Sequence, residues 1–176
     1  MLTFTSPGGS SLKCSGGARA FVVFPTKPEK DVLCLLPVPE ESPVKERISW
    51  PGEYDIAGIT IRGIGQNEGQ KVSYVVEVDG VRIAFPASPL EEWADEDIEK
   101  MGDVHVLVLP AEDAKKCQTL LDEVDPRALF IVPAHDGSLH PDVLKLCGAT
   151  GKEHVKEYKL KGSFAAEGRE VVVFGG

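Results

Sequence analysis

The first half of the chain alternates short apolar runs with turns rich in glycine, proline and polar residues, which is typical of β-strands. Two pairs of these runs have the spacing of hairpins, with turns at Ala57-Gly58 and Asp79-Gly80. Asp-Gly between apolar runs favours a type I′ turn, because both central residues of that turn need positive φ. The runs that we interpret as strands lie at 18–24, 31–36, 53–56, 59–64, 71–78 and 81–85.

From about residue 88 the pattern changes to helices that alternate with strands. Ser88-Pro89-Leu90-Glu91 has the form of a capping box, which predicts Ser88 as the N-cap of a helix that ends near Met101-Gly102. The further predicted elements are strands at 104–110, 128–135, 156–160 and 169–174 and helices at 111–124 and 140–148. Because no linker or repeat interrupts this order, we predict a single domain over 1–176 with two sheets and helices outside them.

Composition and charge narrow the class of protein. The net charge of −9 argues against nucleic acid and anionic membranes as partners, because both require clustered Lys and Arg. The sequence contains no apolar stretch of the roughly 18 residues that a membrane span requires, and its first residues lack the pattern of a secretory signal. The four cysteines are widely spaced, which favours free thiols in a reducing cytoplasm over a disulfide framework or a zinc knuckle. We therefore expect a cytoplasmic protein.

Four segments occur in an order and at a spacing that resemble the metallo-β-lactamase superfamily, close to the branch of zinc-dependent hydrolases that includes L-ascorbate-6-phosphate lactonase. They are WPGEYDIAGITIRGI (50–64), VSYVVEVDGVRIAFPAS (72–88), EKMGDVHVLVLPA (99–111) and VDPRALFIVPAH (124–135). The resemblance covers most of the chain from Asp31 to His135. It implies the α/β (α+β) class, in the form of a compact four-layer αββα sandwich.

The same resemblance implies a metal site at the rim between the two sheets. Members of the family bind one or two zinc ions through a His-x-His-x-Asp-His loop, a downstream His, a bridging Asp and a final His. Imidazoles and carboxylates that leave one zinc position open allow a bound water to become hydroxide near neutral pH. In such a site that hydroxide attacks an ester, lactone, amide or phosphodiester.

This chain departs from the family at nearly every metal position. The positions of the His-x-His-x-Asp-His loop, which follows the run at 31–36, hold Pro37, Pro39, Glu41 and Ser42. Ser88 stands at the bridging Asp, no histidine occurs at 65–67 where the downstream His would fall, and the final position keeps its residue as His135. Proline has no side-chain donor atom, and residues 1–104 contain no histidine. We therefore predict that the chain has no zinc site and no other cofactor.

Several of these residues have two interpretations. Pro37-Val38-Pro39 is either a rigid rim presented to a partner or a stiff loop that replaces a metal-braced one, and we favour the second. Glu40 and Glu41 are either a carboxylate pair for acid–base chemistry or solvated side chains, and the second is again favoured. His135 is either a remaining ligand or substrate-facing group, or a side chain hydrogen-bonded within its loop, and we favour the loop. Ser88 is explained by its predicted N-cap role.

Three functions remain open. We favour a non-hydrolytic binding or scaffolding protein of unknown ligand or protein partner, because the turns, caps and buried strands are intact while the metal ligands are absent. The alternative is a hydrolase with altered chemistry in the same cleft, which would draw on His135, Glu41, Glu53 or Ser88. The third is one subunit of a homo-oligomer or larger assembly, in which the former active-site face packs against a partner.

Overall fold

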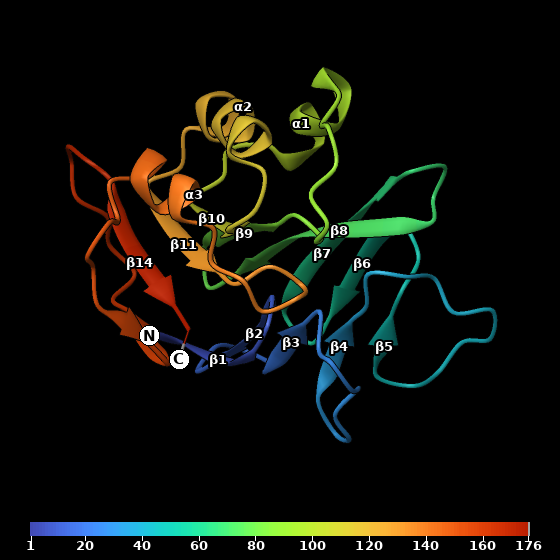
Figure 1. The fold of residues 1–176 in the computed structure, drawn as a ribbon. Coiled ribbons are helices and arrows are strands. Elements are labelled where there is room, and N and C mark those ends of the chain that lie inside the picture. The colour runs from blue at the N-terminus through green and yellow to red at the C-terminus, as the bar shows by residue number, and fades with distance from the viewer. Residues whose placement is uncertain (176) are drawn as a thin grey trace.

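Two β-sheets pack face to face, and the helices lie together outside one of them (Figure 1). The structure is a computed structural model, and residues 1–175 are described. Its helices are short and all come from the second half of the chain. They are α1 (Asp95–Met101), α2 (Ala114–Val124) and α3 (Pro141–Leu146).

The strands divide between a six-stranded and an eight-stranded sheet. The first contains β1 (Leu2–Gly8), β2 (Ser11–Ser15), β3 (Phe21–Val23), β4 (Leu33–Leu35), β5 (Arg47–Ile48) and β13 (Glu157–Leu160), in the order β13-β1-β2-β3-β4-β5. The second contains β6 (Gly52–Ile56), β7 (Ile59–Gln66), β8 (Lys71–Val78), β9 (Val81–Phe85), β10 (Val106–Pro110), β11 (Ala128–Val132), β12 (His154–Val155) and β14 (Glu170–Phe174). Its order is β12-β14-β11-β10-β9-β8-β7-β6.

Alternate residues of the strands form the apolar layer between the sheets. In β1, Leu2 and Phe4 are buried in this layer, and the threonines between and after them are on the other face. The rings of Phe4 and Phe130 come from opposite sheets and meet edge to face with centroids 4.9 Å apart. The predicted α/β class with two packed sheets is therefore confirmed.

The two outer faces of the sandwich are covered differently. The helices pack on the eight-stranded sheet, where Leu107 and Leu129 belong to a second apolar cluster. On the outer face of the six-stranded sheet, the small buried cluster includes Val22 and Cys34, and the Cys34 sulfur lies 3.7 Å from the carbonyl oxygen of Glu29. In the described residues, the three helices lie on the eight-stranded sheet, and the segment between β3 and β4 contacts the outer face of the six-stranded sheet at Glu29 and Val32.

The two predicted hairpins are present, and a third was missed. Ala57 and Gly58 join β6 to β7, and Asp79 and Gly80 join β8 to β9, all four with positive φ as type I′ turns require. The hairpin of β1 and β2 turns at Gly9 and Ser10, and the strands that we predicted from the sequence began only at residue 18. Its signal was present, because threonine and lysine alternate with apolar residues on both strands.

The predicted helix from residue 88 to 101 is wrong over its first half. The helix α1 begins at Asp95, and its N-cap is Ala94, which makes no side-chain capping bond. Ser88 is therefore not an N-cap, since its hydroxyl contacts Glu112 and His135 instead. The helix α2 begins later than predicted, with Asp113 as its side-chain N-cap. The helix α3 begins where it was predicted, with His140 as its side-chain N-cap. No helix within residues 1–175 combines the length and the apolar character that crossing a membrane requires.

A buried tyrosine connects the two sheets beside the loop that follows β4. The hydroxyl of Tyr74, on β8, lies 2.5 Å from the carbonyl oxygen of Leu36 and 3.0 Å from that of Ile48. Burial raises the pKa of Tyr74 above its ordinary value, so the hydroxyl stays protonated and can donate. The chain segments on both sides of the loop at 37–46 are thereby held to the eight-stranded sheet.

We expect Tyr74→Phe to lower the free energy of unfolding by about 1–3 kcal/mol, because a buried donor shared by two carbonyl groups is removed. Urea denaturation monitored by circular dichroism measures this loss. Tyr54→Phe is the matched control, since the Tyr54 hydroxyl donates to the exposed Trp50 carbonyl at 2.7 Å, and its loss should stay below about 1 kcal/mol. Equal losses in the two variants would contradict the role of Tyr74.

Candidate functional site

Three neighbouring parallel strands bring polar side chains to one edge of the eight-stranded sheet. Strands β9, β10 and β11 run in the same direction, so their carboxyl ends meet at that edge, where open α/β sheets bind ligands. Ser88, Glu112 and His135 each follow one of these strands by two or three residues. The structure brings all three side chains into contact.

The Ser88 hydroxyl oxygen is the centre of this cluster. It lies 2.6 Å from Glu112 Oε1, 3.0 Å from His135 Nδ1 and 2.9 Å from the backbone nitrogen of His135. Glu112 Oε1 also accepts a hydrogen bond from the backbone N–H of Leu90 at 2.9 Å. One hydroxyl therefore joins the segments that follow three different strands.

Glu112 was not identified from the sequence as a site residue. The sequence places it at the start of a helix, where a carboxylate has a sufficient explanation in the helix dipole. In the structure α2 begins at Ala114, Asp113 is its N-cap, and Glu112 precedes the cap with its side chain directed to Ser88. The available signal was its position directly after a buried parallel strand, the same position that Ser88 and His135 have on the neighbouring strands.

His135 is hydrogen-bonded and yet accessible. Its Nδ1 faces Ser88, and 52% of its side-chain surface remains exposed. The turn between β1 and β2 lies beside it, since a Cβ added to Gly9 would be 3.9 Å from the His135 carbonyl oxygen. The neighbouring Asp136 carboxylate accepts hydrogen bonds from the hydroxyl and N–H of Ser138, which lower the pKa of Asp136. His135 thus stands at the rim between the two sheets.

The loop after β4 does not join this cluster. The carbonyl oxygen of Pro37 accepts from the N–H of Val72 at 2.9 Å, which fixes the start of the loop against β8. Glu40 pairs with Arg47 at 3.0 Å and accepts from the Trp50 indole at its carbonyl oxygen.

The remaining loop candidates are also held elsewhere or are solvent-exposed. Val38, Glu41 and Ser42 are exposed, and Pro39 is partly buried. Within residues 1–175, none of the hydrogen bonds of Ser88, Glu112 and His135 reaches the segment 37–42.

The candidate Glu53 and the position of the missing downstream His lie elsewhere. Glu53, on the edge strand β6, forms an ion pair with Arg62. Gln66, at the position near which the downstream His would fall, is buried, and its Oε1 accepts from the Ser73 hydroxyl at 3.2 Å. Ser73 in turn accepts from the N–H of Ala87 at 2.9 Å. This second polar contact supports the segment that leads to Ser88.

The residues present do not fit a hydrolytic zinc site. Such a site needs three protein ligands around one ion, and residues 1–175 contain no group of three or more His, Cys, Asp and Glu side chains that could hold a metal. The cluster offers one imidazole and one carboxylate, and Oε1 of that carboxylate already accepts from Ser88 and Leu90. The two prolines of the loop have no side-chain donor atom.

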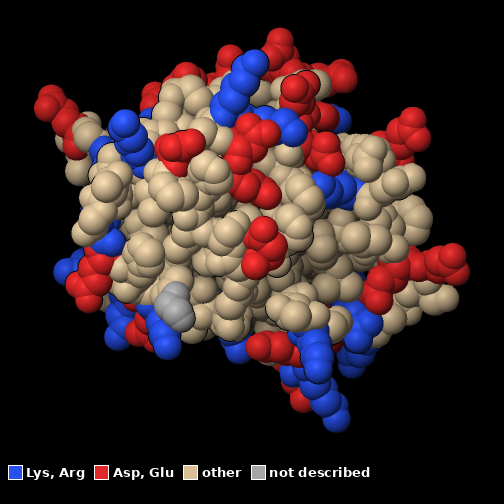
Figure 2. Space-filling view, in the orientation of Figure 1, with Lys and Arg blue, Asp and Glu red and all other residues tan. Residues whose placement is uncertain are grey.

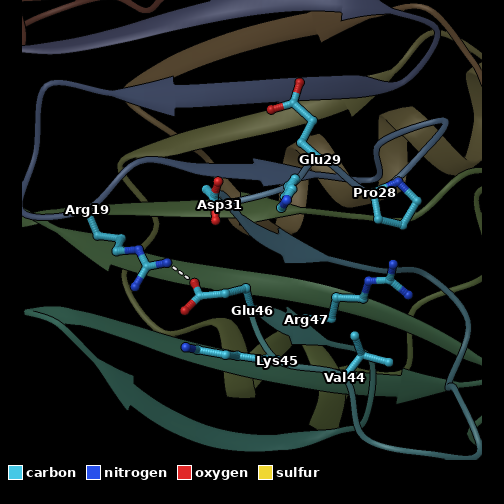
Figure 3. Close-up of a pocket in the computed structure, with 9 residues that line it drawn as sticks. Arg19, Pro28, Glu29, Asp31, Val44, Lys45, Glu46 and Arg47 are labelled. Atoms are coloured by element: carbon cyan, nitrogen blue, oxygen red, sulfur yellow. Dashed lines mark ion pairs between the residues drawn. The ribbon is translucent and has the colours of Figure 1, made fainter.

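A separate hollow lies on the side of the six-stranded sheet (Figure 3). Its volume is about 430 Å³, and its walls come from three segments. The lining residues include Arg19, Asp31, Lys45 and Glu46, with an ion pair between Arg19 and Glu46. Small-molecule pockets are lined mainly by apolar and aromatic side chains. This hollow has charged walls of both signs and shares no residue with the cluster at Ser88.

Charge is distributed unevenly over the surface. Residues 89–125, which include α1 and α2, contain 12 Asp and Glu against 3 Lys and Arg, while the rest of the chain contains 16 of each. Figure 2 shows acidic side chains gathered on the helix-bearing side and basic ones more frequent on the opposite side. Residues 89–125 therefore account for the whole net charge of −9.

Two solved structures with the same fold place the chain among known proteins. A protein of Thermotoga maritima, assigned as a Zn-dependent hydrolase of the metallo-β-lactamase superfamily, matches with a TM-score of 0.76 at 19% identity over 99% of both chains. CmlA, a diiron β-hydroxylase from Streptomyces venezuelae, matches with a TM-score of 0.53 at 9% identity over 82% of this chain and 47% of its own. Neither a family model nor a curated protein matches the sequence. The chain thus has the metallo-β-lactamase fold.

We expect Glu112→Ala to lower the free energy of unfolding by about 1–3 kcal/mol, because the Ser88 hydroxyl and the Leu90 N–H lose their charged acceptor. Glu123→Ala is the control, since that carboxylate is exposed on the same helical side and should change stability by less than about 0.5 kcal/mol. Chemical denaturation of both variants measures the difference. Similar stabilities for the two variants would mean that the cluster does not hold the three segments together.

Proposed function

We propose that this protein is a non-hydrolytic binding or scaffolding protein that uses the metallo-β-lactamase fold without a zinc centre. The observation that carries this proposal is which residues occupy the rim between the two sheets and how they are bonded. The positions of the metal loop hold prolines and exposed side chains, and the remaining histidine is tied to Ser88 and Glu112. A ligand at the rim would meet the half-exposed imidazole of His135, which the contacts with Ser88 and Glu112 hold in place.

A hydrolase with altered chemistry is the second candidate, because His135, Ser88 and Glu112 converge. The order of their contacts argues against it. In serine hydrolases the histidine stands between the serine and the carboxylate and takes the hydroxyl proton as a general base. Here the hydroxyl stands between the carboxylate and the imidazole, and Glu112 is its nearer neighbour, at 2.6 Å against 3.0 Å. This order positions the histidine and differs from that of a catalytic triad.

We further propose that the protein functions in a reducing cytoplasm. Its four cysteines are free thiols, and three of them are buried. Burial raises the pKa of Cys14 and of Cys117 to about 12, so both thiols stay protonated and unreactive at neutral pH. These thiols act as small apolar core groups.

We expect protein purified from zinc-supplemented medium to contain far less than one zinc per chain by elemental analysis. Its melting temperature should not change with added zinc or with EDTA, because a metal that bound the folded state would raise it. His135→Ala provides the comparison and should leave the metal content unchanged. Stoichiometric zinc, together with ester, lactone or phosphodiester hydrolysis that His135→Ala abolishes, would overturn the proposed function.

A further inference from the structure

The proton positions around Ser88 follow from a count of donors and acceptors. A serine hydroxyl has one hydrogen to donate and two lone pairs with which to accept. The Ser88 oxygen has three polar neighbours, namely Glu112 Oε1, the backbone nitrogen of His135 and His135 Nδ1. These contacts use the hydrogen and both lone pairs, so the Ser88 hydroxyl can form no further hydrogen bond.

The hydroxyl hydrogen must point toward Glu112. A carboxylate has no hydrogen of its own, so at 2.6 Å its oxygen would repel the Ser88 oxygen unless the hydroxyl hydrogen lay between them. The backbone N–H of His135 fills one lone pair of Ser88. The other lone pair faces His135 Nδ1 at 3.0 Å, and that contact is a hydrogen bond only if Nδ1 carries a hydrogen.

We propose that Ser88 and Glu112 are positioning residues that hold His135 as the Nδ1–H tautomer, with Nε2 of this half-exposed side chain as the hydrogen-bond acceptor for a ligand that carries a protonated amine. This inference rests on the binding function proposed above and names the chemistry of its ligand. A neutral imidazole with a hydrogen on Nδ1 has a free lone pair on Nε2. The ligand must therefore present a donor at that position.

The charges beside His135 favour an amine over other donors. Glu112 Oε2 lies 3.9 Å from His135 Nδ1, and the exposed Asp136 carboxylate follows directly in the chain. The Glu112 carboxylate attracts a cation and repels an anion at this short range. An ammonium group combines three N–H donors with a positive charge, whereas a carboxylate ligand has neither.

Two other histidines of the chain have the opposite arrangement. His105 Nδ1 accepts from the backbone N–H of Arg82 at 2.9 Å, and His140 Nδ1 accepts from that of Asp142 at 3.3 Å. An Nδ1 that accepts leaves the ring hydrogen of a neutral imidazole on Nε2. His135 is therefore expected to differ from both in a single spectrum, and these two rings are internal references.

Long-range ¹H–¹⁵N correlation spectra of the ¹⁵N-labelled protein test the tautomer about two pH units above the ordinary histidine pKa of about 6.5, where neutral rings predominate. A His135→Gln variant assigns the signal. We expect His135 to show the hydrogen on Nδ1, and His105 and His140 to show it on Nε2. A His135 signal of the Nε2–H type would overturn the proposal.

Three variants identify which groups hold the tautomer. Ser88→Ala and Glu112→Ala should both move His135 toward the Nε2–H form, the first by removing the acceptor of Nδ1–H and the second by freeing the Ser88 hydrogen for Nδ1. Ser88→Thr keeps the hydroxyl and should keep the tautomer. Unchanged His105 signals show that each variant is folded. An unchanged His135 tautomer in folded Ser88→Ala would contradict the role of Ser88.

Methylammonium and acetate at equal ionic strength test the ligand class in the same spectra. Methylammonium should shift the His135 Nε2 resonance of the unaltered protein more than acetate does, and this difference should shrink in Ser88→Ala. An equal or larger shift with acetate would contradict the proposed ligand. These readouts involve neither zinc nor turnover, so they fail or succeed separately from the test of the binding function.

Discussion

The apolar layer between the two sheets is the constraint on which the site depends. Aromatic rings from both sheets meet in this layer, as Phe4 and Phe130 do at 4.9 Å. Because the layer fixes the register of β9, β10 and β11, their carboxyl ends arrive at one rim. Ser88, Glu112 and His135 can share a hydrogen-bond network only because the packing behind them leaves the strand ends so little freedom.

Hydrogen bonds connect the strand ends at a rim where the family resemblance implies a metal. In a zinc site the ion itself holds ligands from several strands together, and its binding contributes to folding. Here a single hydroxyl contacts a carboxylate, a backbone N–H and an imidazole from the neighbouring segments. The loop after β4 is held separately, through the carbonyl oxygen of Pro37 and the hydroxyl of Tyr74. The fold therefore has other means of ordering this rim.

Local sequence patterns predicted the elements whose formation depends on local chemistry. The hairpin turns at Ala57-Gly58 and Asp79-Gly80 were of this kind, and the buried runs that form β10 and β11 were also predicted as strands. The helix predicted from Ser88 begins only at Asp95, because the contacts of Ser88 are not local. The capping box describes a local bond, whereas the Ser88 hydroxyl is engaged by Glu112 and His135, which are 24 and 47 residues away.

Contacts between residues that are distant in the sequence also limited the prediction of the candidate site. Family order placed Ser88 and His135 at the rim, whereas Glu112 has no counterpart in the expected ligand set, and its position directly after a buried strand was the one signal that the sequence offered. The sequence alone shows that the two prolines of the loop cannot bind a metal through their side chains, because this property depends only on the residue type. The positions of Glu41 and Ser42 depend on how the loop folds against the sheet, which their sequence does not encode locally.

The excess of acidic residues over 89–125 makes the charge distribution of the molecule asymmetric. In the field of a charged partner the molecule would rotate during approach, with the helical side toward cations and the sheet side toward anions. Dissolved salt confines this orientation to the last 8–10 Å or so before contact. The distribution of acidic residues would therefore act on a charged molecule that approaches the protein before any specific contact is made.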